Sequence, residues 1–206
     1  MLADAGLHFA DHGFESPTRD VATALGVTQA LIYKHFASKE DLIERMLESL
    51  FSAPGPERHW VDPSQPLEPE LLRYYNKLVS GSNEVRMRLF IRAGLDGRSW
   101  PTRRGSALTH GLFLPVIAAL RRDANLPGLD AVPAMRGERE LVMMLHASIV
   151  FLGIRRHIYR MPMPENLDDV VELYVSTFLR GAAQAMQHLH KNGEDSLKVA
   201  LAVARE

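Results

Sequence analysis

The chain has 206 residues, 46% of them hydrophobic, and its 24 basic and 25 acidic side chains leave a net charge of -1. That length is enough for one large core, or for a small module followed by a larger one. The absence of cysteine excludes disulfides, thiol redox sensing, Cys-containing zinc sites and cysteine nucleophiles, and it fits a reducing, cytoplasmic location.

The first fifty or so residues predict four short helices, because apolar positions recur at every third or fourth residue and hardly ever alternate. The predicted spans are about residues 2–12, 17–25, 28–36 and 38–51. Gly13 ends the first helix in a position that favours left-handed backbone, and Gly26 ends the second. Thr28 is placed to cap the third helix, and Ser38 with Asp41 forms a start for the fourth that is similar to a capping box.

A proline-rich segment separates these helices from a longer helical region. Five prolines lie within residues 53–69, which indicates a loop or linker. Further helices are predicted at about residues 70–80, 84–96, 103–124, 137–160 and 166–191, with one more short helix at 197–204. The sequence therefore predicts an all-α protein with one domain at 1–51 and a larger one at 52–206.

The second and third predicted helices have the order of a helix-turn-helix, with Gly26 at the corner. In that motif the second helix enters the major groove of DNA. Once Ile32 and Phe36 are assigned to the core, the other face presents side chains that suit nucleic acid: Thr28, Gln29, Tyr33, Lys34 and His35. Ala30 lies in the opening turn of the same helix. Gln can bond adenine, Thr and Ala can meet a thymine methyl, and Tyr, Lys and His suit phosphates.

Residues 19–47, RDVATALGVTQALIYKHFASKEDLIERML, closely resemble the amino-terminal domain of TetR-family repressors. The resemblance covers about the first quarter of the chain. It implies that Thr28, Gln29 and Ala30 face bases and that Tyr33 and His35 contact the groove and phosphates. It also implies that Lys39 and Thr18 contact phosphates, at the starts of the fourth and second helices.

The resemblance further implies a carboxyl-terminal domain for ligand binding and dimerisation, without a cofactor. In such repressors the last two long helices form the dimer interface. A stripe on the last one fits this role: Val170, Leu173, Tyr174, Thr177, Phe178, Gly181 and Ala185. The alternative is an internal core helix of a monomer.

A pocket for a small-molecule effector is expected among residues 84–154. Candidates for its wall are Phe90, Leu95, Leu112, Phe113, Met143, Met144, His146 and Phe151, each of which also suits plain core. Residues 68–124 contain ten basic and five acidic side chains. This excess of basic residues is compatible with an anionic ligand or with a basic face exposed to solvent. The run 98–105 is a candidate relay from this domain to the first helix.

The charge of the first domain counts against DNA binding. Residues 1–52 hold four basic and eight acidic side chains. Because Arg19, Lys34 and Lys39 are expected around the groove face, we predict few phosphate contacts and a shallow dependence of affinity on salt. A helical ligand-binding or scaffold protein with a vestigial DNA-binding face remains the alternative.

Enzymatic and membrane functions find little support in the sequence. Asp4, His8 and His12 recur at every fourth position of one helix face, but a fourth metal ligand is missing, and no catalytic motif is present. The longest apolar stretch, 141–154, would extend only about 21 Å as a helix. We therefore expect a homodimeric repressor that binds operator DNA and a small-molecule effector, with no metal, cofactor or membrane partner.

Overall fold

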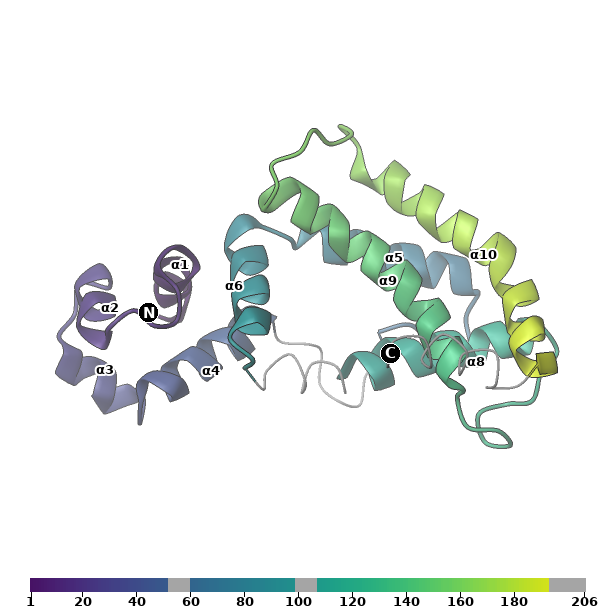
Figure 1. Cartoon of the computed structure of the whole chain (residues 1–206), viewed down its shortest axis with the longest axis horizontal. Coiled ribbons are helices and arrows are strands. Elements are labelled where there is room, and N and C mark those ends of the chain that lie inside the picture. Colours follow the sequence, from purple (N-terminus) through teal and green to yellow (C-terminus); the bar gives the residue numbers. More distant parts are fainter. Residues whose placement is uncertain (52–59, 99–106, 193–206) are drawn as a thin grey trace, which may run out of the picture. The chain divides into compact units, whose positions relative to one another are not determined.

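The computed structural model describes residues 1–51, 60–98 and 107–192, and the regular elements in these ranges are all helical (Figure 1). The prediction of an all-α fold is confirmed. The helix expected at 197–204, and the start of the one expected at 103–124, lie outside the described residues.

Contacts divide the chain into two compact units. Unit 1 comprises Met1–Pro54, Ser82–Ser106 and Gly153–Arg160, and unit 2 comprises Gly55–Gly81, Ala107–Leu152 and Met161–Glu206. Unit 1 thus adds later segments of the chain to the four short amino-terminal helices. The functional boundary between residues 51 and 52 stays a prediction.

The four amino-terminal helices have nearly the expected bounds: α1 is Leu2–His12, α2 is Thr18–Ala24, α3 is Gln29–His35 and α4 is Lys39–Phe51. Their inward faces form one apolar core that includes Phe9, Ile32 and Leu42, each with no exposed surface. Gly13 has the positive φ that favours glycine, at 82°, but its ψ of 165° lies outside the left-handed helical region. Because helices this short are not stable alone, burial of apolar surface in the shared core holds them together.

Helix α6, Glu84–Leu95, belongs to unit 1 and packs against α1 and α4. Its arginines hold the carboxyl-terminal end of α1: Arg88 Nη1 donates to the Asp11 carboxylate at 2.7 Å, and Arg92 donates to the carbonyls of Ala10 and Asp11 at 3.2 Å. Those carbonyls lack partners within their own helix. The guanidinium groups supply both the missing donors and a charge that suits the negative end of the helix dipole.

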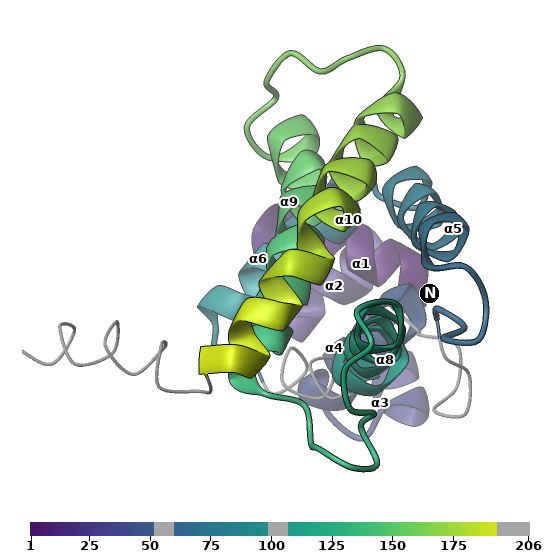
Figure 2. The same cartoon turned by 90° about the vertical axis from the view of Figure 1, so that its right-hand side faces the viewer.

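Unit 2 is built from α5 (Leu67–Ser80), η1 (Thr109–Phe113), α8 (Leu114–Asp123), most of α9 (Arg136–His157) and α10 (Leu167–Asn192). Helix α10 packs against α5 and α8 (Figure 2). Helix α5 starts three residues earlier than predicted, because a proline such as Pro69 is tolerated within a first helical turn. The helix predicted at 103–124 contains a π-helical segment, η1, which periodicity did not reveal.

A buried charge cluster joins three elements of unit 2. Arg121 on α8 has no exposed surface and donates to both carboxylate oxygens of Glu138 on α9, at 2.7 and 2.6 Å. It also donates to backbone carbonyls of the loop between α8 and α9, including that of Val132 at 2.6 Å. His190 Nε2 on α10 lies 2.9 Å from Glu138 Oε1.

Hydrogen bonds decide the ionisation of Glu138. Burial alone would raise the pKa of this carboxyl, but hydrogen bonds from Arg121, His190 and the Met135 N–H outweigh burial and lower the pKa. Glu138 is therefore ionised at neutral pH and balances the charge of Arg121.

Arg121→Met should lower the free energy of unfolding by about 3–5 kcal/mol, because it leaves the Glu138 carboxylate buried without its partner. Urea denaturation measures this loss. The control Arg160→Met removes an exposed pair with Glu84, at 3.3 Å, and should cost less than about 1 kcal/mol.

The same loss should depend on pH in a defined direction. Because the pKa of Glu138 is lowered in the folded state, its stabilising contribution is complete above the ordinary glutamate pKa of about 4.3 and is lost at lower pH. The difference between wild type and Arg121→Met should shrink as the pH falls through this range. Equal losses for Arg121→Met and Arg160→Met at neutral pH would contradict the assigned role.

Candidate nucleic-acid interface

The corner between α2 and α3 is a tight turn. Gly26 has φ 65°, and its N–H donates to the Thr23 carbonyl at 3.1 Å. A Cβ at this position would meet nothing within 4 Å, so space is not what restricts the position. The positive φ of the backbone is what favours glycine here. Thr28 then caps α3, because its Oγ1 accepts a hydrogen bond from the Leu31 N–H at 3.2 Å.

Helix α3 has one buried and one exposed side. Ile32 has no exposed surface and Phe36 only 7%, so both belong to the core of unit 1. The exposed residues are Gln29, Ala30, Tyr33, Lys34 and His35. The predicted base and phosphate contacts of the third helix therefore share the face that packing leaves open.

The remaining predicted phosphate contacts gather around the start of α2. The Tyr33 hydroxyl donates to Thr18 Oγ1 at 3.2 Å, which ties the exposed face of α3 to the first residue of α2. Lys39 Nζ, at the start of α4, lies 3.5 Å from the Ser16 carbonyl oxygen. Thr18 itself is only 7% exposed, so its side chain offers little surface to a partner.

Ser16 and His8 also belong to this cluster. Ser16 was not among the predicted site residues, and His8 was considered only within the trio of Asp4, His8 and His12. His8 Nε2 on α1 lies 2.6 Å from Ser16 Oγ, so α1 supports the segment that precedes α2. Burial, and then the neighbouring His12, lowers the pKa of His8 and favours its neutral form. The Ser-Pro pair at 16–17 was the only local signal for this contact.

Several carboxylates of the first helices are paired. Asp11 pairs with Arg88 at 2.7 Å, Asp41 with Arg45 at 2.8 Å, and Asp20 with Arg19 at 3.5 Å. Unit 1 as a whole contains thirteen basic and ten acidic residues, because its later segments are rich in arginine. The acidic excess of residues 1–52 is therefore reversed within the unit that carries the helix-turn-helix.

The predicted pocket residues fall in both units. Phe90 and Leu95 lie on α6 in unit 1, where Leu95 is 81% exposed. In unit 2, Leu112 and Phe113 are buried in η1, whereas Met143 and Phe151 on α9 are exposed. Of this set, Phe113 and His146 contact each other, with ring centroids 6.2 Å apart. Their role in ligand binding stays a prediction.

The described residues offer neither a metal site nor a membrane-spanning helix. Among the described residues, no group of three His, Cys, Asp or Glu side chains is placed to hold a metal ion, the trio of Asp4, His8 and His12 included. Within residues 1–51, 60–98 and 107–192, no helix combines the length and apolarity that a bilayer span requires.

Solved structures with a similar fold come from several bacteria. PfmR, a TetR-family transcriptional regulator from Thermus thermophilus, is 18% identical, covers 87% of this chain and 96% of its own, and gives a TM-score of 0.54. Weaker likenesses are a TetR-family regulator from Mesorhizobium loti (14% identity, 88% and 92% coverage, TM-score 0.48) and one from Streptomyces coelicolor (19%, 88% and 91%, 0.42). No curated protein of similar sequence was found.

The turn at Gly26 and the two sides of α3 define a helix-turn-helix DNA-binding protein. Residues 5–46 match the family described as bacterial regulatory proteins, tetR family. The amino-terminal helices therefore form a tetR-family domain, and the chain shares its fold with PfmR over most of its length.

Thr28→Ala should lower the free energy of unfolding by about 1 kcal/mol, because the Leu31 N–H loses its cap. Thermal and urea denaturation measure the effect. The control is Thr23→Ala, at an exposed position within α2, where the hydroxyl only bonds back to the Arg19 carbonyl of the same helix, alanine has the higher helix propensity, and no loss is expected. An unchanged stability for Thr28→Ala would show that the cap contributes nothing to α3.

Proposed function

We propose that the protein is a repressor that binds operator DNA as a homodimer and leaves it when a small molecule binds the larger domain. The observation that carries the DNA-binding part is the exposed face of α3, which presents Gln29, Ala30, Lys34 and His35 while Ile32 and Phe36 fill the core. Packing explains Ile32 and Phe36, but it gives the four exposed residues no structural role. Such a protein acts where the chromosome lies, in the cytoplasm.

The residues of α3 divide into two kinds of contact. Gln29 and Ala30 occupy the first turn, which is the part of a recognition helix that reaches base edges. Lys34 and His35 lie in the last turn, where they suit phosphates. Since the Thr28 hydroxyl is engaged in the cap, its expected contact with DNA is through its methyl group.

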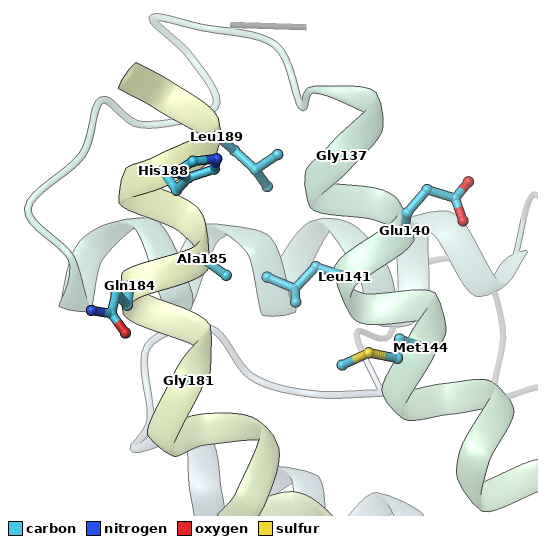
Figure 3. Close-up of a pocket in the computed structure, with 9 residues that line it drawn as sticks. All are labelled: Gly137, Glu140, Leu141, Met144, Gly181, Gln184, Ala185, His188 and Leu189. Atoms are coloured by element: carbon cyan, nitrogen blue, oxygen red, sulfur yellow. The ribbon is translucent and has the colours of Figure 1, made fainter. Parts of the chain in front are cut away.

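Dimerisation is supported by the exposed apolar surface of α9 and α10. Met144 on α9 is 56% exposed and Leu173 on α10 is 57% exposed. An open groove runs between the two helices, and Leu141 and Met144 face Ala185 and Gly181 across it (Figure 3). Small residues on α10 permit close approach of another helix, and a two-fold dimer would present two α3 helices to half-sites about 34–36 Å apart.

Release from DNA requires a connection between the larger domain and the helix-turn-helix. Only Gly81, Ser82 and Asn83 separate α5 in unit 2 from α6 in unit 1. Helix α6 in turn holds the end of α1 through Arg88 and Arg92. A ligand that favours a different placement of α5 would act on α1 through this route and shift the population away from the DNA-binding state.

The DNA contacts predict two different kinds of loss. Gln29→Ala should cost about 1–3 kcal/mol of binding free energy and relax the preference at one base pair of a site selected from random duplexes. Lys34→Ala should weaken all duplexes alike and reduce the salt dependence of binding by about one phosphate contact per subunit. Binding measured across a salt series separates the two.

Lys77→Ala, at an exposed position on α5, is the matched control and should change neither quantity. Wild-type protein that shows no salt-dependent affinity for duplex DNA would contradict the proposed function and favour a scaffold with a vestigial DNA-binding face.

The dimer interface is tested by placing a charge in the groove. Met144→Lys should weaken self-association at least about tenfold, equal to about 1.4 kcal/mol, because the lysine would be desolvated between subunits. Sedimentation velocity measures the dissociation constant. Met161→Lys, at a 47% exposed position in the loop after α9, is the control. An unchanged dimer in Met144→Lys would exclude the α9 and α10 face.

A further inference from the structure

We infer that the effector site lies at a cluster of aromatic side chains in unit 2 and takes a small, uncharged aromatic molecule that donates a hydrogen bond. The aromatic cluster consists of Trp60, Tyr74, Tyr75, Phe113 and His146. This inference rests on the proposed function and adds to it the place of the site and the chemical class of its ligand.

The centre of the site is Tyr75, on α5. Its side chain has no exposed surface, and its hydroxyl oxygen has no hydrogen-bond partner. The next residue, Asn76, also has a buried Oδ1 atom without a partner. Buried polar atoms are almost always paired, because burial removes their water without replacing it. Asn76 faces away from Tyr75 on the helix, so the Tyr75 hydroxyl alone marks the place where a partner molecule supplies the missing hydrogen bond.

The surroundings of Tyr75 favour a flat ring. Its ring centroid lies 4.9 Å from that of Tyr74 and 6.0 Å from that of His146 on α9. Tyr74 stacks on Trp60, with centroids 5.7 Å apart and planes inclined by 10°. Aromatic rings prefer such stacked and edge-to-face arrangements. An aromatic ligand that replaces one neighbour of Tyr75 can therefore make the same kind of ring contact with the rest of the cluster.

The charges of unit 2 exclude an anionic ligand at this site. Among the described residues of unit 2, the buried charged side chains are Arg121 and Glu138, which pair with each other. Arg73, which lies one residue before Tyr74, donates to Glu70 at 2.7 Å and to the Trp60 carbonyl at 2.8 Å. Arg73 and Arg121 are therefore engaged with other groups, and an anion beside Tyr75 would have neither of them as a counter-charge.

One wall of the site is a π-helical segment. Phe113 is the last residue of η1, and Trp60 packs directly on Gly111 in the same segment. A Cβ at Gly111 would lie 2.8 Å from the Trp60 ring, so only glycine allows this close packing of Trp60 on η1. π-Helical turns are rare and occur often at functional sites. Here the segment brings Phe113 beside His146, with ring centroids 6.2 Å apart.

The experiment uses the full chain and the fluorescence of Trp60. The chain has two tryptophans, and Trp100→Phe leaves Trp60 as the only one. The probes are phenol, which has a ring and a donor, toluene, which lacks the donor, and benzoate, which adds a negative charge. Phenol should shift the Trp60 emission saturably and bind at least tenfold more tightly than toluene, and benzoate should not bind. Calorimetry provides the affinities independently.

Tyr75→Phe, which removes one oxygen atom, is the decisive variant. It should bind phenol and toluene equally, and without ligand its melting temperature should equal or exceed that of the wild type, since an unpaired buried hydroxyl is removed. Tyr159→Phe, at a 63% exposed tyrosine, is the matched control and should keep the preference for phenol. A lower melting temperature for ligand-free Tyr75→Phe would show that a buried water already pairs the hydroxyl, and would overturn the inference.

Absence of saturable phenol binding, preference for benzoate, or a phenol preference that survives Tyr75→Phe would also overturn it. Binding of the same protein to duplex DNA without probe is measured in parallel. Loss of the effector site with DNA binding intact overturns only this inference, whereas wild-type protein that does not bind DNA overturns the proposed function.

Discussion

The hold of α6 on the carboxyl-terminal end of α1 is the interaction on which the DNA-binding unit depends. Arg92 donates to two carbonyls that α1 itself cannot satisfy, and Arg88 pairs with Asp11. Gly13 makes this contact possible, because a Cβ there would lie 3.0 Å from Arg92 Nη1. Since α1 also packs against α2 and α4, a fixed end of α1 fixes the base on which the recognition helix rests.

The same contacts also explain how a DNA-binding unit can contain the acidic excess of the first helices. Counted alone, residues 1–52 look unsuited to a polyanion, with eight acidic side chains against four basic ones. The arginines of α6 lie in the same compact unit, and one of them neutralises Asp11 directly. Net charge along a sequence window is therefore a poor guide when distant segments complete the unit, and the field at the DNA surface depends on the whole of it.

The contacts that were predicted from the sequence join residues close together along the chain, whereas the contacts that were missed join residues far apart. The Thr28 cap and the Gly26 corner connect residues only a few positions apart, and Ser38 Oγ accepts from the Asp41 N–H at 3.0 Å as expected. By contrast, Arg121 and Glu138 are 17 residues apart and His190 is 52 from Glu138, and periodicity carries no information on such pairs. The pocket candidates were chosen for apolarity alone, which cannot separate the 81% exposed Leu95 from the buried Phe113.

The free energy that an allosteric switch requires is similar to the cost of leaving the Tyr75 hydroxyl without a hydrogen bond. Leaving one buried polar atom unpaired costs about 1–3 kcal/mol, and a neutral hydrogen bond gained there recovers a similar amount. Allosteric coupling of about 1–3 kcal/mol changes affinity by about 5- to 150-fold. If the effector pairs the Tyr75 hydroxyl only in the conformation that leaves DNA, that one hydrogen bond supplies coupling of the required size. A charged group in the same place would make the ligand-free core far less stable, so a neutral hydroxyl suits the proposed function, in which the protein folds and binds DNA before its ligand arrives.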